Sequence, residues 1–414
     1  MAQTALFRTL TGNDPSDATE ARNGLRHLAS LSMTKIADGL IDPKLVLSWL
    51  LTALGAPAAF AGALVPIREA GALLPQIVFA GYVSGLRQRK WAWVVGSAVQ
   101  GAMAGVIALA ALLLSGWVAG LSICGALAVL AVARSLCSVS YKDILGKTVS
   151  KTRRGAITGF AGSAASAAVI VFAGLLIAGV AQTKGALILA IGLAAAMWIG
   201  AALVFATLQE KDSSPEAGGG VDLALLRDNA TLRRFILVRG LLVSTALAPP
   251  YFVMLGGGDD SQLGKLGALV LASAGASLLS SWIWGRAADR SSRKVLMACG
   301  AIGGLAMLAA VGLSWLGLAD RVWAMPATLF VLMLAYHGVR QGRSTYLVDI
   351  SPAEARAAWA AVANTAIGTL LLIAGAFGGA LSVIGPQAVL IGFAVMAFLA
   401  PVAALGLAEA EKPD

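Results

Sequence analysis

The chain has 414 residues, of which 58% are hydrophobic and 13% are charged, and its mean hydropathy is +0.82. Soluble domains carry about 25% charged residues, so this composition excludes an ordinary soluble protein and indicates a membrane protein. The formal net charge of +10 fits basic loops beside membrane spans better than it fits nucleic-acid binding.

Neither a metal centre nor a cofactor is expected. The three cysteines, Cys124, Cys137 and Cys299, lie in or beside apolar runs, and there are only two histidines. An odd cysteine count at this spacing gives no disulfide framework. Gly146-Lys147-Thr148 resembles the end of a phosphate-binding loop, but Tyr141 stands at the upstream glycine position, so we expect no enzyme of that kind.

Residues 1–41 are polar and mixed in charge, and they contain no secretory apolar region. Within them, Asn23 to Leu40 carries leucines and Ile36 among basic residues. Two alternatives remain open here: an interfacial helix on the inner leaflet, or a loosely ordered cytoplasmic tail.

Runs without Lys, Arg, Asp or Glu mark the membrane spans, since a span needs about 20 apolar residues. Residues 91–133 are too long for one crossing and are expected to turn at Ser115-Gly116. Residues 357–408 are expected to turn near Ile384-Gly385-Pro386. The other runs each give one span, for a total of twelve: 45–67, 70–86, 155–183, 185–209, 240–258, 266–285, 295–319 and 322–339.

The basic residues predict the orientation. Nineteen of the 31 Lys and Arg residues fall after even-numbered spans or in the central loop. Only Arg68, Lys184, Lys265 and Arg321 fall on the other side. Cytoplasmic loops carry the excess of Lys and Arg, so both termini are expected in the cytoplasm and the protein in the inner (plasma) membrane.

The two halves of the chain repeat each other. Gly81, Arg89 and Lys90 align with Gly285, Arg293 and Lys294 at a shift of 204, and Arg134 and Asp143 align with Arg340 and Asp349 at a shift of 206. We therefore expect five parts: residues 1–41 as a cytoplasmic segment, 42–208 and 233–408 as six-helix bundles, 209–232 as a cytoplasmic linker, and 409–414 as a cytoplasmic tail. Such repeats place a cavity between the halves, near the middle of the bilayer.

The stretch from Gly285 to Lys294 has the order Gly-x-x-x-Asp-Arg-x-x-Arg-Lys. It resembles the signature loop of the major facilitator superfamily, and with the twelve spans the resemblance covers the chain after residue 41. It implies an all-α membrane protein with two pseudo-symmetric six-helix bundles. It also implies that the glycine lets two helices approach closely and that the Asp and Arg pair at a cytoplasmic gate.

The first copy of the signature departs from the family pattern because Gly85 stands where Asp is expected. Arg134 occupies the place where many family members carry an arginine linked to proton coupling. The Pro-containing antiporter signature of the fifth span is absent from residues 159–179, so drug-type antiport is not supported by motif.

Charges inside a membrane are costly and mark functional sites. Arg134, Arg239 and Arg340 are candidate cavity cations, and Gln76 and Asn364 are candidate polar lining. Arg134 alternatively forms a structural ion pair or snorkels to the headgroups, and the two amides alternatively join helices.

Two residues are candidates for proton coupling. His337 is also a candidate for the cavity lining: because a histidine side chain ordinarily titrates near neutral pH, we expect it either to carry a coupling proton or to hydrogen-bond a helix backbone as a neutral polar plug. Glu69 follows Pro66 and Arg68 at the expected outer start of the second span, where it either serves as a proton entry or stabilises a helix start.

The cytoplasmic gate is expected to use opposite charges on neighbouring helices, paired when the inner side is closed. Its members are Gly81, Arg87, Arg89, Lys90, Asp143, Gly285, Asp289, Arg290, Arg293 and Asp349.

These observations favour a secondary active transporter for a small organic solute, anionic or zwitterionic, that works by alternating access. Proton coupling and a monomer are expected. One alternative is an efflux permease for amphipathic compounds, which calls for an acidic residue deep in the first span, and none occurs between Lys44 and Arg68. A second is a non-transporting membrane assembly factor with the same fold.

Overall fold

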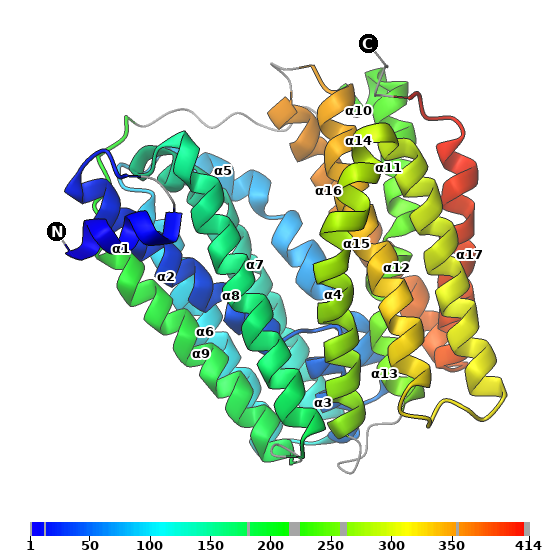
Figure 1. The fold of residues 1–414 in the computed structure, drawn as a ribbon. Coiled ribbons are helices and arrows are strands. Elements are labelled where there is room, and N and C mark those ends of the chain that lie inside the picture. The colour runs from blue at the N-terminus through cyan, green and yellow to red at the C-terminus, as the bar shows by residue number, and fades with distance from the viewer. Residues whose placement is uncertain are drawn as a thin grey trace.

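The computed structural model describes residues 2–11, 14–179, 183–214, 224–256, 263–352 and 356–409, and these residues are almost entirely helical. Figure 1 shows two groups of helices, one from each half of the chain. The helices of the first group are α1 (Ala2–Thr11), α2 (Ala18–Leu40), α3 (Val46–Ala53), α4 (Ala58–Leu73), α5 (Gln76–Ser84), α6 (Lys90–Leu113), α7 (Gly116–Thr148), α8 (Lys151–Ile177) and α9 (Lys184–Ala206). The helices of the second are α10 (Ala224–Asp228), α11 (Ala230–Leu242), α12 (Ser244–Leu247), α13 (Pro249–Leu255), α14 (Leu263–Trp315), α15 (Ala324–Ile350), α16 (Arg356–Ser382) and α17 (Pro386–Ala404).

Ten helices within the described ranges are long and apolar enough to cross a membrane. Two of them lie within α14, where Ser291 has extended backbone angles (φ −166°, ψ 102°) that break the helix inside the predicted signature turn. α4 and α5 together make one candidate, and so do α11 to α13. The helices α2 and α15 are 23 and 27 residues long, and neither is among the ten.

Both turns expected within long apolar runs are confirmed. α6 ends at Leu113 and α7 begins at Gly116, whose φ of +58° is a conformation that glycine adopts without strain. α16 ends at Ser382 and α17 begins at Pro386, a residue suited to the first turn of a helix. Composition and turn chemistry therefore located these helix ends correctly.

The first two spans were placed wrongly. Residues 45–67 are not one helix, because the chain turns between Ala53 and Ala58, with Gly55 at φ +69°. Pro66, Arg68 and Glu69 lie inside α4 and not at a helix start on the outer side. The prediction took charged residues as the ends of spans. Arg68 and Glu69 instead lie within the bundle, and Arg68 is only 8% exposed.

Helix α2 is not a surface helix or a loose tail, because it packs along α8 and α9 in the first group. Asp17 caps its start by accepting a hydrogen bond from the Glu20 amide at 2.6 Å. His27 is fully buried and lies 2.7 Å from the Thr148 hydroxyl of α7. The first bundle therefore begins near residue 18 rather than at 42.

The two groups meet through α4 with α16, α8 with α14, and α3 with α13. Gly375 packs on Pro66, Gly62 packs on the Tyr251 hydroxyl, and Gly267 packs on the end of α8. Figure 1 shows the groups close together around α3 and α13 and further apart around α5 and α10. The halves therefore touch mainly at the end opposite the turns before α6 and after α7.

Candidate functional site

A cavity of about 250 Å³ lies between the two halves. The first half contributes α2, the α2–α3 turn, α4 and α7, and the second half contributes α15. The lining residues are Asp38, Asp42, Pro43, Lys44, Val65, Arg68, Glu69, Ala72, Arg134, Tyr336, Arg340 and Arg343. Three sequence-predicted site residues, Arg134, Arg340 and Glu69, are therefore brought together here.

Asp38 is the centre of the charged cluster on the side of the first half. Its Oδ1 accepts a hydrogen bond from Arg68 at 2.5 Å, and its Oδ2 accepts one from Arg134. The three side chains come from α2, α4 and α7, so one carboxylate joins three helices. Only 23% of the Asp38 side chain is exposed. Charge-assisted hydrogen bonds of this kind are among the strongest in proteins.

Cations outnumber carboxylates around the cavity. Five lining residues are basic and three are acidic, which gives a local net charge of +2. The Lys44 ammonium lies 3.6 Å from the centroid of the Tyr336 ring and so joins the two halves by a cation–π contact. Among the described residues, Arg340 and Arg343 make no ion pair with a carboxylate. The lining of the cavity therefore carries more positive than negative charge.

A smaller recess of about 60 Å³ adjoins this cavity on the side of the second half. Glu69, Tyr336, Arg340 and Arg343 line both spaces. Arg239 of α11 lines the recess; its Nη2 donates to the Asn364 Oδ1 of α16 at 3.2 Å. The recess therefore brings two more of the predicted residues to the site, Arg239 by lining it and Asn364 by contacting Arg239.

The other two predicted lining residues lie elsewhere. His337 packs edge-on against the neighbouring Tyr336 ring, with centroids 5.2 Å apart, and does not line either cavity described above. Gln76 donates to the Ala72 carbonyl of its own helix turn at 2.8 Å and is also absent from both linings. Roles for these two residues in binding or coupling stay predictions.

Sequence reasoning missed five charged lining residues: Asp38, Asp42, Lys44, Arg68 and Arg343. No acidic residue occurs between Lys44 and Arg68, but Asp38 and Asp42 line the cavity just before that range. Asp38 lies at the end of α2 and Asp42 in the turn that follows. The sequence did contain one relevant signal. Asp42-Pro43 interrupts the apolar pattern, and such an interruption is as compatible with a break inside one span as with a boundary before it.

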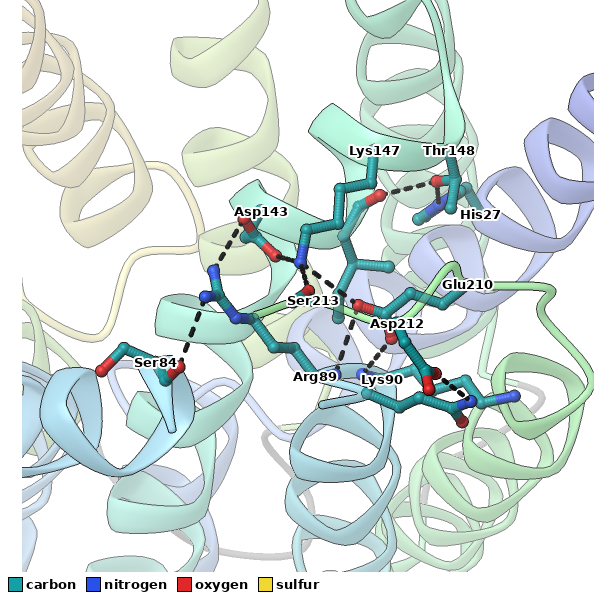
Figure 2. A network of polar contacts seen from close by, with 12 residues as sticks. His27, Ser84, Arg89, Lys90, Asp143, Lys147, Thr148, Glu210, Asp212 and Ser213 are labelled. Carbon is teal, nitrogen blue, oxygen red and sulfur yellow. Dashed lines mark hydrogen bonds and ion pairs between the residues drawn. The ribbon is translucent and has the colours of Figure 1, made fainter. Parts of the chain in front are cut away.

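A second charged cluster lies at the turn before α6, at the other end of the first half (Figure 2). Arg89 pairs with Asp143 at 2.8 Å, and Asp143 pairs with Lys147 at 2.5 Å. The Glu210 carboxylate accepts hydrogen bonds from the backbone amides of Arg89 and Lys90 at 3.2 and 2.8 Å. The Glu210 side chain is fully buried, so a residue just after α9 caps the start of α6.

The start of the linker, just after α9, makes hydrogen bonds to the same turn before α6. Asp212 accepts hydrogen bonds from Gln88 and Arg87 at 2.9 and 2.7 Å, and these bonds lower the pKa of its carboxyl. The Lys90 ammonium donates to the Ala206 and Leu208 carbonyls at 3.2 and 2.8 Å. Carboxylates from the chain after α9 therefore meet this turn, where Gly85 replaces the expected Asp.

The second half carries a matching contact. Arg293 pairs with Glu409 at 3.2 Å, and the Ser291 hydroxyl donates to the same carboxylate at 2.8 Å. Glu409 follows α17 as Glu210 follows α9. Neither glutamate was identified from the sequence, because no local pattern connects it to a turn more than 110 residues away.

The gate differs in detail from the expectation. The pairs made by Arg87, Arg89 and Arg293 each join residues of one half and do not bridge the halves. A Cβ at Gly81 or Gly285 would meet no atom within 4 Å, so neither glycine lies at a close helix approach. Arg290 is exposed, Asp349 takes part in an interaction whose partner is not assigned, and the side chain of Asp289 lies outside the described residues.

Comparisons with known proteins show what the fold is similar to. No family model matches the chain, and no curated protein sequence matches it. Among solved structures, the nucleoside transporter NupG matches with a TM-score of 0.71 at 13% identity, over 92% of this chain and 98% of that one. The POT family transporter PepTSo matches with a TM-score of 0.70 at 12% identity, over 93% and 97% of the two chains.

A D-xylose–proton symporter also matches, with a TM-score of 0.68 at 13% identity over 94% of this chain and 98% of that one. All three solved structures are transporters, not enzymes, and their fold agrees with the two-bundle arrangement expected from the signature loop and the repeats. This chain is a multi-pass membrane protein with the fold of the major facilitator superfamily.

Proposed function

We propose that the chain is a proton-coupled secondary transporter that moves a small anionic or zwitterionic solute by alternating access. One observation carries the proposal: Asp38, held by two arginines, lines a cationic cavity between two pseudo-symmetric halves. Ionisable groups inside a membrane protein mark substrate paths and proton relays, and a cavity at the interface of the repeats is where transporters of this architecture bind their solute.

Twelve membrane crossings follow if α2 with α3 forms the first and α15 forms the tenth. The charges on both elements have partners or line the cavity, so they do not argue against burial in the membrane. With Arg68 inside the bundle, the outer loops keep only Lys184, Lys265 and Arg321. That asymmetry supports cytoplasmic termini in the inner membrane, with 209–232 as the linker and a monomer as the working unit.

Alternating access needs two conformers of similar energy, which a solute or a proton biases by differential affinity. The halves touch at the end opposite the turn before α6, which supports an inward-open conformer under the proposed orientation. The pairs from Arg89 to Asp143 and from Arg293 to Glu409 hold each half rigid at its cytoplasmic end. Closure of that end would bring the two clusters together.

Asp38 is the proton carrier of this proposal, in place of Glu69 or His337. While Asp38 is ionised, it occupies both Arg68 and Arg134. Protonation of Asp38 removes one negative charge from the lining of the cavity and so strengthens its attraction for an anionic solute. Proton and anion therefore bind cooperatively, because each favours the same arrangement of the cluster.

The test is uphill uptake by the full chain reconstituted in proteoliposomes. The panel contains mono- and dicarboxylates, zwitterionic amino acids, neutral sugars and lipophilic cations, each offered with and without an imposed pH gradient. We expect accumulation of a carboxylate or a zwitterion that requires the gradient. Exclusive movement of neutral sugars or of lipophilic cations would contradict the proposal.

Efflux of amphipathic compounds is the second candidate, because Asp38 and Asp42 supply the acidic residues that it needs. A pocket of about 280 Å³ beside Asp38 is also lined by Trp93 and Trp198. Accumulation of lipophilic cations in the panel would favour this alternative. A non-transporting assembly factor would move no member of the panel, although a scaffold has no use for a cationic cavity between its halves.

A further inference from the structure

We propose that the recess around Arg239 is a carboxylate subsite, so that the solute is a small carboxylate whose anionic head lies against the second half. This inference rests on the proposed function, and it adds the chemical class of the solute and the place of its charged end. The first half then holds the proton at Asp38, and the second half holds the anion.

The first argument is the state of Arg239. Arg239 is only 5% exposed. Among the residues that the structure describes, its side chain makes one hydrogen bond, to the neutral amide of Asn364. Its Nε has no hydrogen-bond partner. A buried guanidinium without a carboxylate is costly unless something compensates it, and Arg239 both lines the recess and keeps an unused donor.

The second argument is charge. Three arginines line the recess, Arg239, Arg340 and Arg343, against one carboxylate, Glu69. The local net charge is therefore +2 before a solute binds. A planar carboxylate matches the fork of N–H donors on a guanidinium and accepts two hydrogen bonds from it. An amine would meet repulsion in the same place.

The third argument is size. The recess, at about 60 Å³, is small beside the larger cavity of about 250 Å³, so a small polar group such as a carboxylate suits it better than a large one. Leu73, Leu242, Val243 and Leu371 supply apolar walls, and the recess shares Arg340 and Arg343 with the larger cavity. A planar carboxylate is smaller than a tetrahedral anion, so a carboxylate on a short carbon chain is the better match to a small recess that opens into a larger cavity.

The experiment measures binding to the purified full chain in detergent by its shift in Tm. The probes share one length: butanoate, butanamide, butylamine and propylphosphonate. A ligand that binds only the folded state raises the Tm with concentration. We expect a rise with butanoate and none with the other three.

Two variants locate the site, and both are first checked for a single symmetric peak in gel filtration. Loss of charge-assisted hydrogen bonds in Arg239→Gln is expected to raise the half-effect concentration of butanoate about 30-fold. Arg239→Lys keeps the charge but loses the fork, so a smaller loss is expected. The matched control is Arg321→Gln, an exposed arginine in the turn before α15, for which no change is expected.

The outcomes separate this inference from the proposed function. Equal butanoate affinity in wild type and Arg239→Gln, no response to butanoate, or a response to butylamine overturns the carboxylate subsite. Uphill uptake of another solute in those cases would leave the transporter role standing. Binding of butanoate that depends on Arg239, with no uphill movement of any solute, would support the subsite and contradict proton-coupled transport.

Discussion

Replacement of Asp38 by asparagine tests the charged cluster most directly, because one carboxylate serves two arginines. The asparagine side chain would keep the size of the original but leave Arg68 and Arg134 without an ion-pair partner. Removal of one member of a buried ion pair costs about 3–5 kcal/mol. Since the Asp38 side chain is 23% and the Arg134 side chain 39% exposed, we expect the lower end, about 3 kcal/mol.

The assay is thermal unfolding of the purified protein in detergent. At about 2 °C per kcal/mol for a chain of this size, Asp38→Asn is expected to lower the Tm by about 6 °C. The matched control is Asp320→Asn, whose carboxylate is 83% exposed and lies 3.4 Å from Lys265. An exposed pair contributes about 0–1 kcal/mol, so its Tm is expected to change by less than about 2 °C.

A double-mutant cycle supplies the refutation. The double variant Asp38→Asn with Arg134→Gln removes both charges of this ion pair. Its loss of unfolding free energy is expected to be smaller than the sum of the losses in the two single variants, by about 1–3 kcal/mol. Additive effects, or a Tm change for Asp38→Asn no larger than that for Asp320→Asn, would show that the Asp38 cluster is not a coupled, buried unit.

Three further changes follow from the same structure. Glu210→Gln weakens the buried cap on the Arg89 and Lys90 amides and is expected to cost about 1–2 kcal/mol in thermal unfolding; an unchanged Tm would contradict that role. Phe7→Ala removes a fully buried ring packed on Gly24 and is expected to lower the free energy of unfolding by about 3 kcal/mol; an unchanged Tm would contradict the packing of α1 on α2. Gly375→Val places a branched side chain against the ring of Pro66, so it is expected to disfavour contact of the halves at that end; equal reactivity of cysteines introduced on the two sides, in variant and wild type, would refute this.

Features encoded by local composition were predictable. The turns at Ser115-Gly116 and Gly385-Pro386 lie within long apolar runs, where length alone demands a reversal and glycine or proline marks its place. The signature stretch at 285–294 and the repeat of the halves predicted the fold class. These signals are patterns in the sequence itself, so one chain is enough to detect them.

Features encoded by distant pairing were not predictable. Arg68 ended a predicted span because its partner, Asp38, lies 30 residues earlier on another helix. α2 was predicted as an interfacial helix or a loosely ordered tail, yet Asn23 bonds to Gln209 and His27 lies against Thr148 of α7. The same reason hid Glu210, whose contacts to the start of α6 span about 120 residues. Arg134, Arg239 and Arg340 were found because an isolated charge in an apolar run is visible without its partner.

Proton movement driven by the solute tests the central claim, with a pH-sensitive dye enclosed in proteoliposomes that carry no initial gradient. The account predicts that addition of a transported carboxylate changes the internal pH with wild type. With Asp38→Asn it predicts no change in internal pH, while exchange of labelled for unlabelled solute continues. Solute-driven proton movement that persists in Asp38→Asn, or wild-type uptake without any proton movement, would contradict it.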